Sequence, residues 1–102
     1  MNTRKYIVID ETGLHARPAA VFVKAMAALP SAVRVTVGDR SANGKSILEV
    51  LALGVVQGGV IVIDFGETEE GLILRAEAEL AGIVRGDDRA RQHPDLDQGP
   101  GL

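Results

Sequence analysis

The sequence contains no cysteine, and this absence excludes disulfide bonds, thiol catalysis and cysteine-bound metal ions. Aromatic residues make up only 3% of the chain, which leaves few side chains on which the bases of a single-stranded nucleic acid could stack. The formal net charge of −3 gives no basic surface of the kind that binds nucleic acid. We therefore expect no nucleic-acid partner.

Long apolar segments are missing as well. The first ten residues, MNTRKYIVID, hold a basic pair and only a short apolar run before an acidic residue, unlike a signal peptide. A membrane-spanning helix needs about 18 or more apolar residues in succession, and no such run occurs. We therefore expect a cytoplasmic protein with no membrane insertion, and 102 residues suit one small domain.

Strand and helix patterns alternate along most of the chain. Short runs rich in β-branched residues predict strands, and apolar residues three or four positions apart predict helices. The predicted strands are residues 5–10, 33–37, 40–42 and 60–65. The predicted helices are residues 16–29, 47–53 and a last one that follows residue 68. Their buried stripes are Ala19, Phe22, Val23, Met26 and Leu29 in the first helix, and Leu72, Ala76, Leu80 and Ile83 in the last.

The order β-α-β-β-α-β-α predicts an α+β fold of two layers, in which the helices cover one face of a sheet. Two of the predicted strands are apolar at consecutive positions, near residues 7–9 and 60–63, whereas a sheet with one face in water should alternate. A partly apolar outer face or a homodimer would account for this pattern.

The composition changes at Gly86. Residues 86–102 hold three glycines, two prolines and almost no apolar side chains, so they cannot bury enough surface to become ordered. We expect a domain of residues 1–85 and a disordered polar tail of residues 86–102, in which His93 has no assigned role.

The stretch ETGLHARPAAV places His15 directly before the first predicted helix. The first backbone N–H groups of a helix, here from Ala16 onward, lack partners within it and suit an anion. Pro18 fits the first turn, where a missing N–H does no harm, and the Arg17 guanidinium suits phosphate oxygens. Because imidazole can serve as a neutral nucleophile near pH 7, this combination predicts a histidine that accepts a phosphoryl group.

Spacing alone leaves two simpler interpretations of His15 open, a helix cap and an ordinary surface histidine. A metal site is not predicted, because no second histidine, aspartate or glutamate stands at metal-ligand spacing. Glu11 is four residues away, but it lies in a predicted loop. No cofactor is expected.

A second motif, Ser46-Ile47-Leu48-Glu49, has the pattern of a capping box. Ser46 would cap the helix at residues 47–53, and Glu49 would occupy its third position. That helix is nearly all apolar, although two turns can bury only one face, so part of it must be exposed. Exposed apolar patches often mark partner sites. The residues expected to form and surround this patch are Ala16, Ala20, Ile47, Leu48 and Leu51, with Arg17, Lys24 and Lys45 as cations around it.

The segments GLHARPAA at 13–20 and NGKSILEVLALG at 43–54 resemble the HPr family, the histidine-containing phosphocarriers of the phosphoenolpyruvate-dependent sugar phosphotransferase system. The resemblance covers about residues 4–85, and the first motif is highly specific. It implies an open-faced β-sandwich of four antiparallel strands, covered on one face by three helices.

The resemblance also implies roles for the site residues. His15 would take a phosphoryl group on Nδ1 from enzyme I and pass it to a histidine of a sugar-specific enzyme IIA, while Arg17 contacts the phosphate. Such a carrier is a substrate of two other proteins and not a stand-alone catalyst. Relatives use the surface around the second helix for docking. Glu49 departs from the many relatives with glycine or lysine there, and it would weaken docking to an acidic partner or select a different one.

In many relatives the serine equivalent to Ser46 is phosphorylated by HPr kinase/phosphorylase. The added charge would oppose transfer from enzyme I and signal to a catabolite-control transcription factor. Because the cap accounts for Ser46 without a kinase, both roles stay open.

A phosphocarrier is therefore the main prediction, and three alternatives remain. One is a regulatory protein of the same fold that acts through phosphorylated Ser46. Another is a carrier in a nitrogen-regulatory or dihydroxyacetone-kinase branch, and the last is a plain binding domain. Relatives specialised for regulation tend to lack the active histidine, so His15 favours the carrier.

Overall fold

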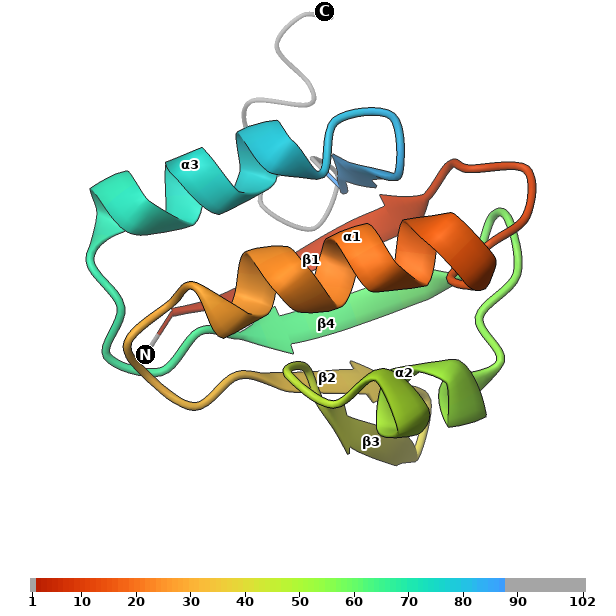
Figure 1. Cartoon of the computed structure of the whole chain (residues 1–102), viewed down its shortest axis with the longest axis horizontal. Helices are drawn as coiled ribbons and strands as arrows, with labels where there is room; N and C mark the ends of the chain where they lie inside the picture. Colours follow the sequence, from red (N-terminus) through yellow and green to blue (C-terminus); the bar gives the residue numbers. More distant parts are fainter. Residues whose placement is uncertain (1, 88–102) are drawn as a thin grey trace, which may run out of the picture.

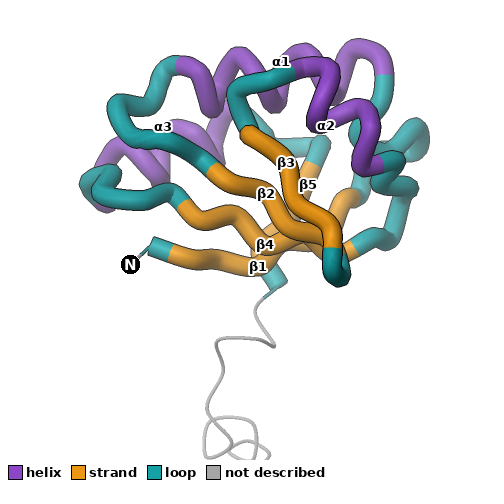
Figure 2. The backbone as a smooth tube through the Cα atoms, turned by 90° about the horizontal axis from the view of Figure 1, so that it is seen from below, coloured by secondary structure: helices purple, strands orange, loops and turns teal. Residues whose placement is uncertain are grey.

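Three helices lie on one face of a five-stranded antiparallel sheet (Figure 1). A computed structural model describes residues 2–87, and the remaining residues, including most of the predicted tail and His93, lie outside the described part. The strands are β1 (Thr3–Val8), β2 (Arg34–Val37), β3 (Arg40–Asn43), β4 (Val60–Asp64) and β5 (Val84–Gly86). The helices are α1 (Ala16–Ala27), α2 (Ile47–Leu53) and α3 (Glu70–Glu79). The predicted α+β open-faced sandwich is confirmed, as the two layers in Figure 2 show.

The strand order in the sheet is β3-β2-β4-β1-β5, which is one strand more than the four expected. Strand β5 was missed because it is only three residues long and holds an arginine and a glycine, so it has no strand pattern of its own. It forms because Gly82, with a φ of 88°, turns the chain after α3. Val84 then pairs with Val8 of β1 and is buried.

The ordered structure also continues past the expected domain end at residue 85. Gly86 pairs with Tyr6, and the Asp87 amide donates a hydrogen bond to the Lys5 carbonyl oxygen at 2.9 Å. Because these contacts join residues 86 and 87 to β1, the described fold includes two residues that the sequence assigned to the tail.

The two central strands explain the consecutive apolar positions of the sequence. Tyr6 and Val8 of β1 face the helices, with Ile61 and Ile63 of β4, and all four are buried. The intervening residues Ile7, Val60 and Val62 lie on the opposite face, where Val60 remains 42% exposed. The outer face of the sheet is therefore partly apolar, which is one of the two explanations that the sequence left open.

The buried stripe of α1 agrees with the sequence, and in the α3 region Ala76, Leu80 and Ile83 are buried as predicted, whereas the first position differs. Phe22 and Met26 of α1 are fully buried, and Val23 is half-buried. In α3 the fully buried residue is Ile73, and Leu72 is only half-buried. The sequence predicted Ile83 as part of this helix, but the helix ends at Glu79, so the buried Ile83 belongs to the turn into β5. Within residues 2–87, no helix has the length and apolar character needed to cross a membrane.

Candidate functional site

Helix α1 begins at Ala16, so His15 occupies the N-cap position that the sequence predicted. Its backbone is extended, with φ −133° and ψ 162°, as an N-cap requires. The imidazole, however, makes no capping hydrogen bond, and the residue is exposed. The interpretation of His15 as a helix cap therefore has no support in the hydrogen bonding, and the ring is accessible for chemistry.

The first turn of α1 leaves two backbone donors available beside this ring. Within residues 2–87, the N–H groups of Ala16 and Arg17 have no hydrogen-bond acceptor. Pro18 has no N–H, and the Ala19 amide donates to the His15 carbonyl oxygen at 3.4 Å. Since the helix dipole adds partial positive charge here, the turn can hold the oxygens of an anion such as a phosphoryl group.

Ala16 itself has an unusual backbone. Its φ of 51° is the only positive value of a non-glycine residue among those described. A residue with a β-carbon in this left-handed region costs about 1–2 kcal/mol. Strained positions of this kind cluster at functional sites, so the conformation marks the junction between His15 and the helix as a constrained part of the site.

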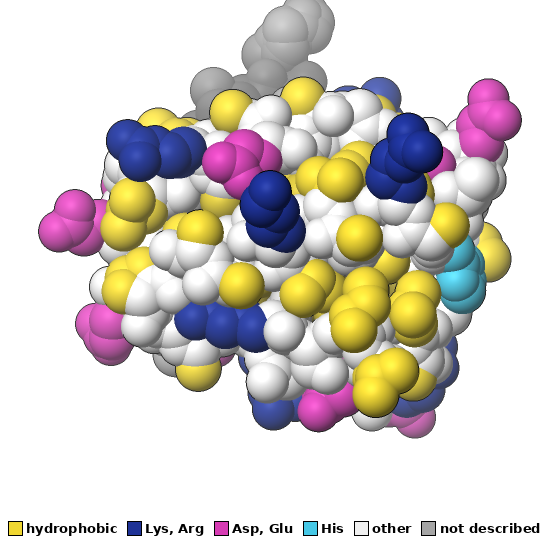
Figure 3. All heavy atoms as spheres, in the orientation of Figure 1, with side chains coloured by type: hydrophobic (Ala, Val, Ile, Leu, Met, Phe, Trp, Pro, Cys, Tyr) yellow, Lys and Arg dark blue, Asp and Glu magenta, His cyan; other side chains and the backbone are white. Residues whose placement is uncertain are grey.

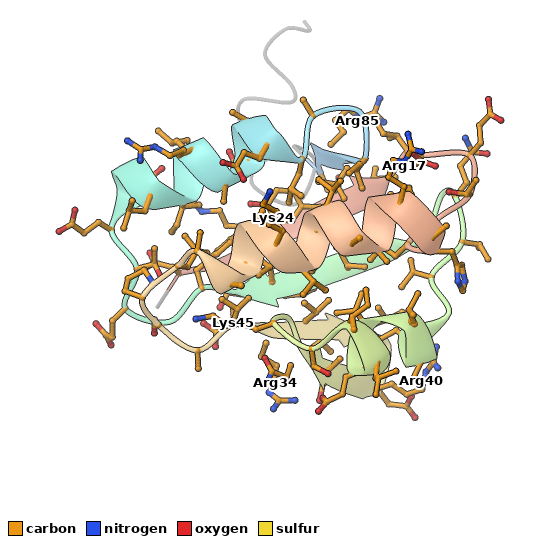
Figure 4. All side chains as sticks on the ribbon, viewed as in Figure 1. Arg17, Lys24, Arg34, Arg40, Lys45 and Arg85 are labelled. Carbon is orange, nitrogen blue, oxygen red and sulfur yellow. The ribbon has the colours of Figure 1, made fainter. Side chains whose placement is uncertain are left out.

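Helix α1 also supplies the cations of the site. Arg17 and Lys24 both project from α1 and are exposed (Figure 4). No carboxylate in the described part of the chain lies within 4.0 Å of either cation. The guanidinium of Arg17 is thus available to an oxyanion at the start of the helix.

The loop before His15 packs against the segment that follows α2. The sequence did not predict this contact. The Leu14 amide donates to the Val55 carbonyl oxygen at 2.9 Å, and Leu14 is fully buried. Gly13 has a φ of 74°, and a β-carbon there would overlap this same carbonyl and approach Val56. The glycine of the GLHARP motif is the local signal for such close packing, but nothing in the sequence identifies residues 55–56 as the neighbours.

The turn before His15 is held by an aspartate. One carboxylate oxygen of Asp10 accepts hydrogen bonds from the Thr12 hydroxyl at 2.7 Å and from the Thr12 amide at 2.8 Å. These two bonds, the hydroxyl bond foremost, lower the pKa of Asp10 below its ordinary value. The carboxylate therefore stabilises the turn in its ionised form.

Ser46 caps α2, but the predicted capping box forms only in part. The Ser46 hydroxyl accepts a hydrogen bond from the Glu49 amide at 3.2 Å, as expected. The Glu49 carboxylate, by contrast, accepts from the Asn43 amide at 2.8 Å, while the Ser46 amide donates to the Asn43 carbonyl oxygen at 3.0 Å. The other bond of a capping box, from the Ser46 amide to the Glu49 carboxylate, does not form. The Ser46 amide instead donates to the Asn43 carbonyl oxygen, and the Asn43 amide donates to Glu49.

An exposed apolar patch joins the two helix starts, and we define it as Ala16, Ala20, Ile47 and Leu48. Ile47 is 38% exposed and Leu48 76% exposed. Figure 3 shows apolar side chains gathered over α1 and α2 on this face, with the histidine at its edge. Two expected members fit less well. Leu51 is half-buried and packs against the core, and the Lys45 ammonium donates to the Leu29 carbonyl oxygen at 2.7 Å.

Known proteins resemble this chain over most of its length. The family model for the PTS HPr component phosphorylation site matches residues 2–85. The phosphocarrier protein HPr of Haemophilus influenzae is 39% identical over 71 residues, which cover 69% of this chain and 84% of that protein.

Two solved structures extend the likeness to three dimensions. An HPr from Thermoanaerobacter tengcongensis has a TM-score of 0.65 and 30% identity, covering 79% of this chain and 97% of the other. A phosphocarrier protein HPr from Bacillus anthracis has a TM-score of 0.66 and 29% identity, covering 80% and 95%.

Proposed function

Because the chain belongs to the HPr family of phosphocarriers, we propose that His15 accepts a phosphoryl group from phosphorylated enzyme I and passes it to a histidine of an enzyme IIA. The single observation that supports this role is the arrangement at the start of α1. There an exposed imidazole without a capping bond precedes two N–H groups without acceptors and an arginine without an ion pair, all within residues 2–87.

The proposed chemistry uses each of these groups. A neutral imidazole nitrogen, Nδ1 in the family pattern, attacks phosphorus as the bond to the donor breaks, so the group moves without a free phosphate intermediate. The N–H groups of Ala16 and Arg17 donate to the phosphoryl oxygens, and the Arg17 guanidinium neutralises part of their charge. The second transfer is a displacement of the same kind, in which a histidine of enzyme IIA attacks phosphorus and His15 is the leaving group.

Regulation through Ser46 is a second proposal on the same protein. A phosphate on the Ser46 oxygen would add a charge of about −1.5 to −2 beside the apolar patch, at the start of α2. This charge would oppose the docking of an acidic partner and give HPr kinase/phosphorylase and a catabolite-control transcription factor a surface to recognise. The cap is the competing explanation, since the hydroxyl already has a structural role.

The direct test of the carrier role is phosphorylation in solution. The protein is incubated with enzyme I of the same cell, phosphoenolpyruvate and Mg²⁺, and is followed by intact mass and ³¹P NMR. We expect one acid-labile phosphate that is absent in His15→Ala and retained in Ser46→Ala. An acid-stable phosphate, or none with an enzyme I that is active on another carrier, would contradict the proposal and shift attention to Ser46 and ATP-dependent kinases.

A further inference from the structure

Helix α2 carries one charged residue, Glu49, and the structure fixes the position of its carboxylate. Oxygen Oε1 accepts a hydrogen bond from the Asn43 amide at 2.8 Å. No lysine or arginine in the part of the chain that the structure describes lies within 4.0 Å of this carboxylate. The negative charge is therefore held in place by a backbone group, yet no lysine or arginine among residues 2–87 forms an ion pair with it.

This charge borders the apolar patch on the side away from α1. Val50 and Leu53 of α2 are buried, and the helical spacing of about 100° per residue then puts Ile47 toward α1 and Glu49 toward β3. The bond from Glu49 to Asn43 of β3 agrees with this placement.

The opposite border of the patch has the opposite sign. Helix α1 contains Arg17 and Lys24 and no acidic residue, and neither cation is paired within residues 2–87. The apolar patch thus lies between two cations on α1 and one anion on the far side of α2. We call the patch together with these three charged residues the docking face.

A shallow hollow of about 350 Å³ adjoins Glu49 between α2 and β3. Its lining residues are Arg40, Ser41, Glu49, Ala52 and Leu53. The Arg40 guanidinium is held at the end of α2, where it donates a hydrogen bond to the Leu53 carbonyl oxygen at 2.7 Å (Figure 4). Ala52 and Leu53 offer apolar surface for an aliphatic stem, and Glu49 offers an acceptor for the charged head that such a stem carries in lysine or arginine.

We propose that Glu49 determines which partner docks on this face, and that enzyme I of the same cell presents a lysine or arginine to Glu49. This inference rests on the proposed phosphocarrier function. A partner with a carboxylate opposite Glu49 would bring like charges together, which costs affinity and suppresses the wrong pairing. Glu49 acts through docking and does not touch the phosphoryl group.

The test compares two substitutions in the transfer of phosphate from enzyme I to His15. Glu49→Gln keeps an oxygen for the Asn43 amide but removes the charge, and Glu49→Lys reverses the charge. We expect the KM for this protein to rise about 3-fold in Glu49→Gln and about 10-fold or more in Glu49→Lys, with kcat unchanged. Both increases should shrink in high salt, because ions screen charges at an exposed rim.

The matched control is Glu67→Lys, the same change at an exposed position in the turn between β4 and α3, for which KM should not change. An unchanged KM in Glu49→Gln, or a lower KM in Glu49→Lys, would overturn the inference. If Glu49→Lys does not fold, Glu49→Gln decides alone, since it retains the bond to Asn43. Failure of the proposed function is separate, because then the unsubstituted protein would acquire no phosphate on His15.

Discussion

Two helices of this protein begin in closely similar ways and end up chemically different. Each follows a turn in which a side-chain oxygen accepts a hydrogen bond from the amide two residues later. Before α1 the Thr12 amide donates to Asp10, and before α2 the Lys45 amide donates to Asn43. At α2 the Ser46 hydroxyl then caps the helix. At α1 the cap position holds His15, whose ring makes no such bond.

The difference shows how a small fold separates stability from function. At the start of α2 a side chain of the helix itself satisfies one donor, since the Ser46 hydroxyl accepts the Glu49 amide, and this bond stabilises the helix. The start of α1 leaves donors available, so the helix forgoes about 1 kcal/mol of capping and keeps a site for an anion. Substitutions that exchange these two properties test the comparison directly.

The largest effect is expected from giving α1 a cap. In His15→Asp a carboxylate would accept the first amides of the helix, and phosphoryl transfer through residue 15 would be lost completely. Because the backbone of residue 15 already has N-cap geometry, the free energy of unfolding should rise by about 0.5–1 kcal/mol. Urea unfolding and ³¹P NMR measure both, with His15→Ala as the control that loses transfer without the added stability. Equal stabilities of the two variants would show that the donors of α1 are already satisfied.

Removal of the cation at the same helix start should give the next largest effect. Arg17→Ala is expected to slow transfer about 100-fold, in line with the loss of a charged donor to a transferring phosphoryl group. Since Arg17 is exposed and makes no ion pair within residues 2–87, stability should change by less than about 0.5 kcal/mol. Rapid-quench kinetics and urea unfolding check the two values. Lys5→Ala, on the outer face of the sheet, is the control, and equal losses of rate and stability in Arg17→Ala would argue against a phosphate contact.

At the start of α2, removing the cap should lower stability and leave phosphoryl transfer intact. Ser46→Ala removes the hydroxyl that accepts the Glu49 amide, and it should lower the free energy of unfolding by about 1 kcal/mol. His15 should still become phosphorylated, because the change leaves α1 intact. Thermal unfolding and the phosphorylation assay measure this, and Ser46→Asp, which can still cap, is the matched variant. A stability that does not change in Ser46→Ala would mean that the serine is retained for another reason.

The smallest expected effect is a pH dependence of the turn at Asp10 that the turn at Asn43 does not share. The folded pKa of Asp10 lies below its ordinary value, so ionised Asp10 stabilises the fold above about pH 4, and this contribution is lost as the pH falls through the lowered pKa. Asn43 does not titrate. We therefore expect the Thr12 amide resonance to shift on acidification and the Lys45 amide resonance to stay constant, as followed by ¹H–¹⁵N NMR. Thr12→Val should move the midpoint toward the ordinary value, and a shift at Lys45 equal to that at Thr12 would point to general acid unfolding.

The sequence predicted those parts of the molecule that depend on neighbouring residues. The start of α1 at Ala16, the cap at Ser46 and the end of α2 at Gly54 all follow from local chemistry. The carrier motif also predicted the position of Arg17.

Contacts between distant residues were not predictable in this way. The bond from the Lys45 ammonium to the Leu29 carbonyl oxygen joins residues far apart in the sequence, and the packing of Gly13 on Val55 depends on how a later loop folds back. Strand β5 exists because β1 offers it an edge, and not because residues 84–86 favour a strand.

The place of β1 in the sheet has a consequence for synthesis of the protein on the ribosome. Both neighbours of this first strand come from the second half of the chain, since Thr3 pairs with Asp64 and Tyr6 with Gly86. Loops of this length close slowly, and no earlier segment of the chain can substitute for them. Strand β1 is therefore made before both of its neighbours, and its apolar residues lack β4 until residue 64 has emerged and β5 until residue 86 has emerged.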